Sequence, residues 1–363
     1  MIVKAAEFIK SGGVVAFPTE TVYGLGADAT NEEACKKIFT TKGRPSINPL
    51  IVHVHNIKQA ESIAQFNKDA YKLGEQFWPG PLTIVLNLNK SHNIANVVLA
   101  GLPTIAIRIP SHPLALELIN RSGTYIAAPS ANPSGYISAT ELDHVKEHFD
   151  SHEVYFVESS LSLQNSNKKA QQSQELIPFP IPNDTYEFQD KAAQRAYVRE
   201  HNRDPQNSYV SLGMGNGLIG LESTIIDLSS GQPTLLRHGF ITIESLELVL
   251  GKKIKPSSSL MEIKAPGMLE KHYAPNSKLR IDATELTSNE IGLNFGDSKL
   301  NTGYNLNLSD KGDLIEAAAN LYSMLRILDT YAIHNDVIGI AVAPIPYVNI
   351  GFAINDKLKR AAI

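Results

Sequence analysis

Short apolar runs and longer amphipathic segments alternate along the first part of the chain. In the run TIAIRI, the isoleucines at 105, 107 and 109 share one face, and Thr104, Ala106 and Arg108 share the other, which is the two-residue period of a strand. Comparable runs predict strands at 14–17, 50–54, 82–88, 104–109, 124–128 and 153–157. Helical spacing and capping residues predict helices at 5–10, 31–42, 56–64, 68–77, 113–121 and 140–148. Strands that alternate with helices indicate an α/β fold.

The pattern changes in the second half of the chain. Residues 159–214 are polar and rich in Gln, Asn and Ser, which predicts a loop or a partly ordered insertion. Apolar patterning then returns and predicts strands at 222–227, 233–237, 278–281, 291–295 and 337–342 and helices at 242–250, 312–331 and 351–362. We therefore expect a first domain over 1–250, an interdomain linker over 251–276 and a small α/β domain over 277–363.

The stretch from Gly13 to Val54 joins several of these elements through polar loops. Pro18 ends the first strand because it has no N–H for a sheet ladder, and the expected loop at 19–26, TETVYGLG, is rich in hydroxyl groups and glycine. A helix that Asn31 can cap follows, and it runs out into the basic loop KGRP. A second strand then carries an inward-facing polar residue. This combination predicts a site for an anion or a small molecule.

Length and charge limit the classes of protein that fit. A chain of 363 residues exceeds one compact core of ordinary size, so two domains are expected. Its 43% hydrophobic and 19% charged residues suit a soluble globular protein. A net charge of −4 excludes a protein that binds polyanions over its whole surface, so any contact with nucleic acid needs a local patch.

The single cysteine bears on the compartment. Cys35 cannot form an internal disulfide, which fits a reducing environment. It lies in the middle of a predicted helix and is interpreted as a buried structural thiol rather than a nucleophile. The sequence shows neither a signal peptide nor an apolar run approaching the ~20 residues that span a bilayer. We therefore expect a cytoplasmic protein without membrane contact.

Several polar side chains need a chemical explanation. Lys42 and Arg44 lie in a Gly/Pro loop, where a pair of cations can neutralise phosphate oxygens. His53 can give a hydrogen bond to a substrate, be satisfied in the core, or ligate zinc together with His55, although a third ligand is not evident. Arg108 needs a partner because an unpaired buried charge is very costly. Either an acidic residue or a ligand carboxylate can supply that partner.

Three further patterns are weaker. Ser130 follows a strand without a G-x-S-x-G frame, so a triad nucleophile is unsupported, and Ser130 with Asn132 suits phosphate or sugar binding better. The string GNGLIG at 215–220 fits GxGxxG, but a strand rather than a helix is expected to follow it, so we reject a dinucleotide site. A helix over 190–203 would carry a basic stripe, either solvated or in contact with phosphate: Lys191, Arg195, Arg199 and Arg203.

The motifs taken together resemble one family. In chain order they are FPTETVYGLG, KGRPSINPLIVHV, WPGPLT, TIAIRIP, AAPSAN, LESTIID, LLRHG and APGMLEKHYAP. The chain resembles the long, two-domain form of threonylcarbamoyl-AMP synthase over 12–157 and 220–275, and more loosely beyond, best at GFAIND. This resemblance implies a YrdC-type twisted mixed sheet with helices around a concave site, and a smaller C-terminal Rossmann-like α/β domain. It also implies that the linker can cover the active site.

The resemblance implies an activity as well. Family enzymes make threonylcarbamoyl-adenylate from L-threonine, bicarbonate and ATP, and they release pyrophosphate. The product feeds the threonylcarbamoyladenosine modification of tRNAs that read ANN codons, through downstream transfer proteins. Mg²⁺ would arrive with ATP, so no dedicated metal site is expected. A weak contact with tRNA remains open.

Motif positions carry the family's site residues onto this chain. Those that match the threonine-contacting positions are Thr21, His53, Arg108, Ala128 and Ser223. Those that match the ATP-contacting positions are Arg44, Asn48, Thr104, Ser130, Ser138 and Arg237. The K-x-R…S-x-N signature, which is the implied catalytic set, is Lys42, Arg44, Ser130 and Asn132. In this scheme Arg108 pairs with the threonine carboxylate, and cations line the phosphates.

Departures from the family pattern leave alternatives open. The insertion replaces a short segment that contains Asp and Gly, and Glu270 stands where a Tyr commonly contacts ATP, so His272 or Tyr273 would have to substitute. The C-terminal domain is short. A second reading is an RNA-binding or ribosome-associated YrdC-type module without this catalysis. A hydrogenase-maturation carbamoyltransferase shares the domain, but it needs zinc-finger cysteines that a chain with one cysteine lacks.

Overall fold

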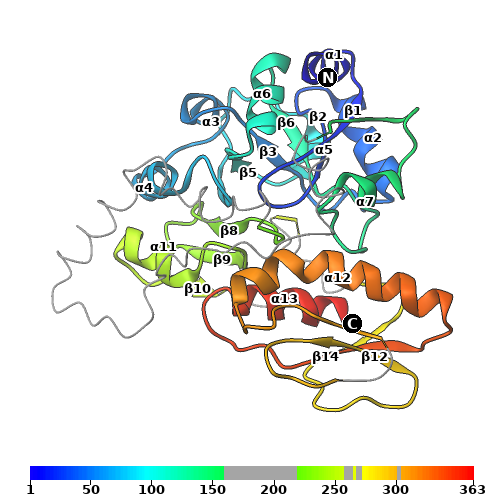
Figure 1. The fold of residues 1–363 in the computed structure, drawn as a ribbon. Helices are drawn as coiled ribbons and strands as arrows, with labels where there is room; N and C mark the ends of the chain where they lie inside the picture. The colour runs from blue at the N-terminus through cyan, green and yellow to red at the C-terminus, as the bar shows by residue number, and fades with distance from the viewer. Residues whose placement is uncertain (159–218, 257–264, 267–271, 301–303) are drawn as a thin grey trace.

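The computed structural model describes residues 1–158, 219–256, 265–266, 272–300 and 304–363. Four sequence-based expectations lie outside these residues: the insertion at 159–214, the basic stripe at 190–203, most of the GNGLIG string, and Glu270. The described residues form two sheets with their helices (Figure 1), so the α/β expectation is confirmed.

The larger sheet contains ten strands in the order β10-β9-β8-β4-β5-β3-β6-β2-β1-β7. Their bounds are β1 (Val14–Phe17), β2 (Gly24–Asp28), β3 (Ile51–His53), β4 (Leu82–Asn87), β5 (Thr104–Arg108), β6 (Ile126–Ala128), β7 (Val154–Phe156), β8 (Thr224–Asp227), β9 (Thr234–Arg237) and β10 (Lys255–Pro256). β3 runs parallel to β5 and antiparallel to β6, so the sheet is mixed, as expected.

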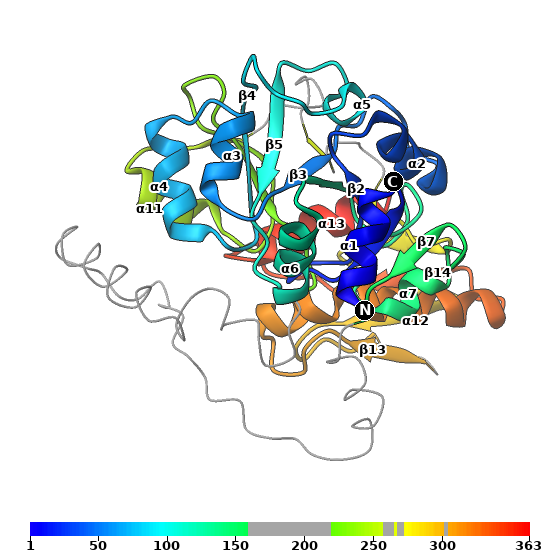
Figure 2. The ribbon, with the colours of Figure 1, turned by 90° about the horizontal axis from the view of Figure 1, so that it is seen from above.

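Helices cover both faces of this sheet. They are α1 (Ile2–Lys10), α2 (Glu32–Lys42), α3 (Ile57–Ile63), α4 (Lys68–Phe77), α5 (Asn96–Leu99), α6 (Pro113–Ser122), α7 (Leu142–Lys146) and α11 (Ile243–Leu250). The helices α1 and α6 lie side by side over one face (Figure 2), where they bury Val15 and Phe17. The helices α2, α3, α4 and α11 contribute to the apolar core on the other face of the sheet, which includes Val14 and Ala16 of β1. No helix in the described part of the chain is both long enough and apolar enough to cross a membrane.

The expected loop at 19–26 is wrong in its second half. Gly24–Asp28 is the strand β2, which pairs with β1 and β6. Glycine is needed here for packing, because a Cβ on Gly26 would lie 2.7 Å from the ring of Phe17. The predicted helix at 140–148 is also shorter in the structure, since α7 covers only Leu142–Lys146. No expectation anticipated α5, β10 or the strand β13 described next.

The C-terminal unit has a four-stranded sheet in which the paired strands run parallel. It contains β11 (Lys278–Arg280), β12 (Glu290–Asn294), β13 (Asn305–Asn307), β14 (Gly339–Val342), α12 (Leu314–His334) and α13 (Gly351–Ala361). A parallel sheet with helices agrees with the expected α/β domain. Its apolar core also takes in Val22, Ile137 and Leu221 from loops of the first unit. Figure 1 shows α12, in orange, on the side of this unit that faces the larger sheet.

Candidate active site

Residues of β3, β5 and β6 line a pocket, together with the loop that follows β1 and the segment that leads into β8. Its lining is mostly hydroxyl groups, cations and rings: Thr19, Thr21, Tyr23, Arg44, His53, Arg108, Ala128, Ser130, Glu222, Ser223, Arg237, Pro266, His272 and Tyr273 among others. All the residues matched to threonine contacts by sequence therefore lie around one cavity. Of the residues matched to ATP contacts, Arg44, Ser130 and Arg237 line it too.

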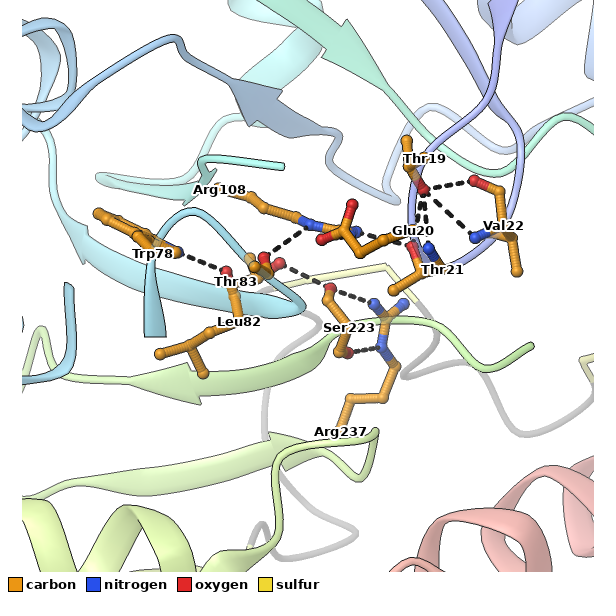
Figure 3. A network of polar contacts seen from close by, with 11 residues as sticks. Thr19, Glu20, Thr21, Val22, Trp78, Leu82, Thr83, Arg108, Ser223 and Arg237 are labelled. Atoms are coloured by element: carbon orange, nitrogen blue, oxygen red, sulfur yellow. Dashed lines mark hydrogen bonds and ion pairs between the residues drawn. The ribbon is translucent and has the colours of Figure 1, made fainter. Parts of the chain in front are cut away.

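Arg108, at the end of β5, has an acidic partner inside the protein. Its Nη2 donates to Glu20 Oε1 at 2.6 Å, its Nη1 donates to Thr21 Oγ1 at 3.0 Å, and its Nε donates to the Gly80 carbonyl at 3.3 Å (Figure 3). The sequence left open whether an acidic residue or a ligand would pair with Arg108, and Glu20 answers that question. A guanidinium has five N–H donors. One donor on each terminal nitrogen is therefore still available to a ligand carboxylate.

A tight turn aims Glu20 and Thr21 at this guanidinium. Thr19 Oγ1 donates to the Val22 carbonyl at 2.6 Å, and it accepts from the backbone N–H of Thr21 at 3.2 Å and of Val22 at 3.3 Å. Figure 3 shows this turn beside the end of the Arg108 side chain. Such a hydroxyl-stabilised turn follows naturally from the sequence PTET, in which Pro18 has already ended the strand.

His53 lies next to Arg108 across the sheet. It pairs with Arg108 on β5 and with Ile126 on β6, and its ring meets Phe17 edge-on at 6.1 Å. Burial, and then the charge of Arg108, lower the pKa of His53 to about 3. The ring is therefore neutral near pH 7. Its Nδ1 has no hydrogen-bond partner among the described residues, so a ligand can use it.

Ser223 and Arg237 form a second contact point. Arg237 Nη2 donates to Ser223 Oγ at 2.9 Å, and its Nε donates to the Ser223 carbonyl at 2.9 Å (Figure 3). Thr83 Oγ1 lies 2.7 Å from Ser223 Oγ. A residue matched to threonine and a residue matched to ATP are thus in direct contact, which places the two predicted half-sites side by side.

Buried cations converge on one wall of the pocket. Burial, and then the charge of Arg237, lower the pKa of Arg44 to about 9. Burial, followed by the charges of Arg44, Lys42, Arg237 and Lys357, holds the pKa of His272 well below its usual range. Concentrated positive charge in a buried place needs anionic partners. This wall can therefore hold the phosphate groups of a ligand.

The K-x-R and S-x-N segments meet, although 88 residues separate Lys42 from Ser130. Lys42 Nζ donates to the Ser130 carbonyl at 2.5 Å and also to the Asn132 carbonyl. Ser130 lines the pocket, whereas Lys42 and Asn132 are buried beside it. Burial, and then the charge of Arg44, hold the pKa of Lys42 well below its usual range. In this arrangement Lys42 fixes the loop that presents Ser130.

The remaining predicted ATP contacts lie away from the cavity lining. Asn48 is buried, and its side-chain amide has no hydrogen-bond partner among the described residues. Thr104 begins β5, roughly 13 Å along the strand from Arg108 by the usual rise per residue. Ser138 is fully buried and donates to Glu222 Oε1, so it touches the pocket through that carboxylate.

Sequence reasoning missed three polar residues of this region. One is Glu20. The second is Glu222, which lines the pocket, and the third is Tyr322 of α12, whose hydroxyl donates to Glu222 Oε2 at 2.8 Å. Tyr322 also stacks on Tyr273, with ring centroids 5.7 Å apart. Glu20 and Glu222 could have been suspected from the sequence, because each directly precedes a hydroxyl residue matched to threonine, Thr21 in PTET and Ser223 in LEST. Nothing in the sequence around Tyr322 indicates its contact with Glu222.

The fold and the pocket define a class of protein. A mixed α/β sheet presents a carboxylate-binding arginine, hydroxyl groups and a basic wall in one cavity, which suits an enzyme acting on small polar and phosphorylated molecules.

Comparisons with known proteins identify the family. A family model described as telomere recombination matches residues 7–168, and one described as the threonylcarbamoyl-AMP synthase C-terminal domain matches residues 241–363. The threonylcarbamoyl-AMP synthases of Pyrococcus abyssi and Bacillus subtilis are each 34% identical over 99% of this chain, and the match covers 93% and 92% of those proteins. The chain belongs to the threonylcarbamoyl-AMP synthase family, and the family inferred from the motifs is confirmed.

A solved structure agrees with this assignment. Sua5 of P. abyssi complexed with L-threonine is similar to this protein with a TM-score of 0.76 and 31% sequence identity, over 99% of this chain and 94% of that chain. The similarity includes both the larger sheet and the C-terminal unit.

Proposed function

We propose that this chain makes threonylcarbamoyl-AMP from L-threonine, bicarbonate and ATP and releases pyrophosphate. The observation that carries the proposal is Arg108, which is held by Glu20, Thr21 and Gly80 and still offers one donor on each terminal nitrogen. It lies in the same cavity as a basic wall. An amino-acid carboxylate and a triphosphate are the ligands that this pair of features suits.

The threonine half-site consists of Thr21, His53, Arg108, Ala128 and Ser223. Arg108 receives the carboxylate, and the neutral His53 and the hydroxyls of Thr21 and Ser223 offer hydrogen bonds to the other polar groups. The related Sua5 complexed with L-threonine supports this choice of amino acid.

The ATP half-site is the basic wall and the loop that carries Ser130. Arg44 and Arg237 supply planar forks to phosphate oxygens, and Lys42 fixes the loop from behind. Mg²⁺ enters with ATP and is held mainly by phosphate oxygens. Because the phosphate oxygens supply most of its ligands, this role does not call for a protein cage.

The reaction proceeds in two parts. The amine of threonine combines with the carbon of bicarbonate to form a carbamate. A carbamate oxygen then attacks the α-phosphorus of ATP, the bond to the bridging oxygen breaks, and pyrophosphate leaves. Positioning and charge neutralisation carry such a transfer, so no protein nucleophile is needed. The product would pass to transfer proteins that modify tRNAs reading ANN codons, in a reducing, cytoplasmic setting that the single cysteine fits.

The test is pyrophosphate release from ATP with each substrate omitted in turn. We expect release only when L-threonine and bicarbonate are both present, and we expect threonylcarbamoyl-AMP in stoichiometric amount by mass spectrometry. Release that is independent of threonine would refute the assignment. Serine in place of threonine is the matched comparison, because it removes one methyl group and tests the shape of the cavity.

A further inference from the structure

Glu20 lies between two residues that line the pocket, Thr19 and Thr21, and one of its carboxylate oxygens has no partner among the described residues. Glu20 is 7% exposed, and its Oε1 accepts from Arg108. Its Oε2 is buried and has no hydrogen-bond partner among the described residues. A charged oxygen left without a donor costs more than an ordinary lost hydrogen bond. The oxygen therefore stands ready for a donor that the described residues do not supply.

The proposed reaction creates a need for a proton acceptor. Threonine is a zwitterion at neutral pH, and its ammonium group has no lone pair with which to attack carbon. The balanced step is ammonium plus bicarbonate giving carbamate, water and one proton. The nitrogen gives up two of its three protons in this step. One leaves with the bicarbonate hydroxyl as water, so a group in the site must take the other.

The other groups around the pocket are poor acceptors. The rings of His53 and His272 have lowered pKa values, so they bind a proton weakly. Burial raises the pKa of Tyr273, which keeps its hydroxyl protonated. Both oxygens of Glu222 are already engaged, one by Ser138 and the other by the Tyr322 hydroxyl. Within the described lining and its contacts, Glu20 is the carboxylate that retains an available oxygen.

The charges of Glu20 and Arg108 complement those of an amino-acid zwitterion, which has one carboxylate and one ammonium group. Arg108 offers a free donor on each terminal nitrogen to a carboxylate, and Glu20, in direct contact with it at 2.6 Å, offers a free acceptor to an ammonium. We propose that Glu20 binds the α-ammonium of the amino acid whose carboxylate lies on Arg108, and that it takes one proton from it as the carbamate forms. This inference rests on the proposed function.

The electron movements follow directly. An N–H bond of the ammonium breaks and an O–H bond forms at Glu20 Oε2. The freed nitrogen lone pair then forms the N–C bond to the carbon delivered by bicarbonate. The carbamate keeps its negative charge on oxygen for the attack on the α-phosphorus. Glu20 returns its proton to solvent after the product leaves.

The variant Glu20→Gln tests this role. The amide oxygen can still accept from Arg108, but it cannot take a proton. We expect forward pyrophosphate release at pH 7 to fall by about 100-fold or more, which is the usual size of a lost acid–base group. The reverse transfer, ATP formation from threonylcarbamoyl-AMP and pyrophosphate, starts from a formed carbamate, and we expect it to change by less than about threefold.

The pH profile gives a second readout. With glutamine at this position, the forward rate should rise about tenfold per pH unit, because only threonine that has already lost its proton reacts, whereas the wild type should vary little from pH 7 to 8. Glu20→Asp should recover part of the forward rate. Glu117→Gln, which alters an exposed carboxylate paired with Arg121, is the matched control and should leave both directions unchanged.

Two results would overturn the proposal. An unchanged forward rate in Glu20→Gln is one. Equal loss in both directions is the other, because it would make Glu20 only a positioning residue for Arg108. Failure of the proposed function gives a different result, since the wild type itself would then release no pyrophosphate in response to threonine.

Discussion

At the scale of single residues, the pocket shows what strand patterning can and cannot predict. The alternation of apolar and other residues along 104–109 predicted that Arg108 lies on the strand face opposite the isoleucines. The same alternation along 50–54 assigned His53 to one face of its strand. Both lie in the pocket. The partner Glu20 could not be chosen, because 88 residues separate it from Arg108 and only the tertiary fold joins them. A buried charge predicts that a partner exists, but it does not identify the partner.

Arg108→Lys should therefore harm the use of threonine more than the use of ATP. Lysine keeps the charge next to Glu20 but loses the planar fork. Loss of one charge-assisted contact predicts a KM for threonine about 10- to 100-fold higher. The dissociation constant for ATP, measured by calorimetry without threonine, should change by less than about threefold. Arg121→Lys, in an exposed ion pair, is the control. Equal losses for both ligands would contradict a carboxylate role.

At the scale of elements, one face of α12 holds a loop of the first unit. Tyr322, Arg326 and Asp329 are spaced four and three residues apart, so they lie on the same side of the helix. Their side chains contact three different residues of the first unit. Tyr322 donates to Glu222 at 2.8 Å, Arg326 donates to the Ile137 carbonyl at 2.6 Å, and Asp329 accepts from the Tyr136 hydroxyl at 3.0 Å. The loop held in this way carries Ser138, whose hydroxyl also reaches Glu222.

Tyr322→Phe tests whether this helix face positions Glu222. Removal of the hydroxyl leaves a buried carboxylate oxygen without its donor, which should cost about 1–3 kcal/mol in the free energy of unfolding. We expect a lower Tm and a raised KM for at least one substrate, with the secondary structure unchanged by circular dichroism. Tyr331→Phe, on the same helix but stacked on Tyr304 within the C-terminal unit, is the control. Equal KM values in the two variants would show that the hydrogen bond from Tyr322 is not needed to position Glu222.

Elements with strong local signals were predictable, and elements defined by packing were not. Asn31, Asn56 and Asn67 each accept a backbone N–H at a helix start, and these caps are legible in the sequence. The strand β2 was missed because its glycines oppose strand propensity, and they are there to make room for Phe17. The four-residue helix α5 and the two-residue strand β10 are too short to leave a periodic pattern.

At the scale of the whole molecule, buried and half-buried histidines link stability to pH. Burial is the first cause of a lowered pKa for His53, His112, His144, His148, His238 and His272. In the unfolded chain such a ring binds a proton below about pH 6.5, whereas the folded ring of His53 does so only near pH 3. Between these values the unfolded state holds more protons. The folded state therefore loses stability as the pH falls through this window.

The predicted outcome is a Tm that drops clearly between pH 7 and pH 5. Each such histidine contributes at most about 1.4 kcal/mol per pH unit within its window. His53→Gln should make the dependence of the unfolding free energy on pH shallower, whatever it does to the absolute stability. His152→Gln changes an exposed histidine and serves as the control. The same slope in the wild type and in His53→Gln would show that His53 does not contribute.

The contacts made by α12 also set the order in which a newly made chain can become active. Asp329 meets Tyr136 across 193 residues, and Tyr322 meets Glu222 across 100. During translation the first unit is made before α12, and domains generally fold in the order in which they are made. Until α12 leaves the ribosome, Glu222 lacks the hydrogen bond from Tyr322. The loop at 136–138 likewise lacks its hydrogen bonds to Arg326 and Asp329. The surroundings of the pocket are thus completed by a helix that follows the first unit in the chain, and a chain that stops before α12 lacks these contacts.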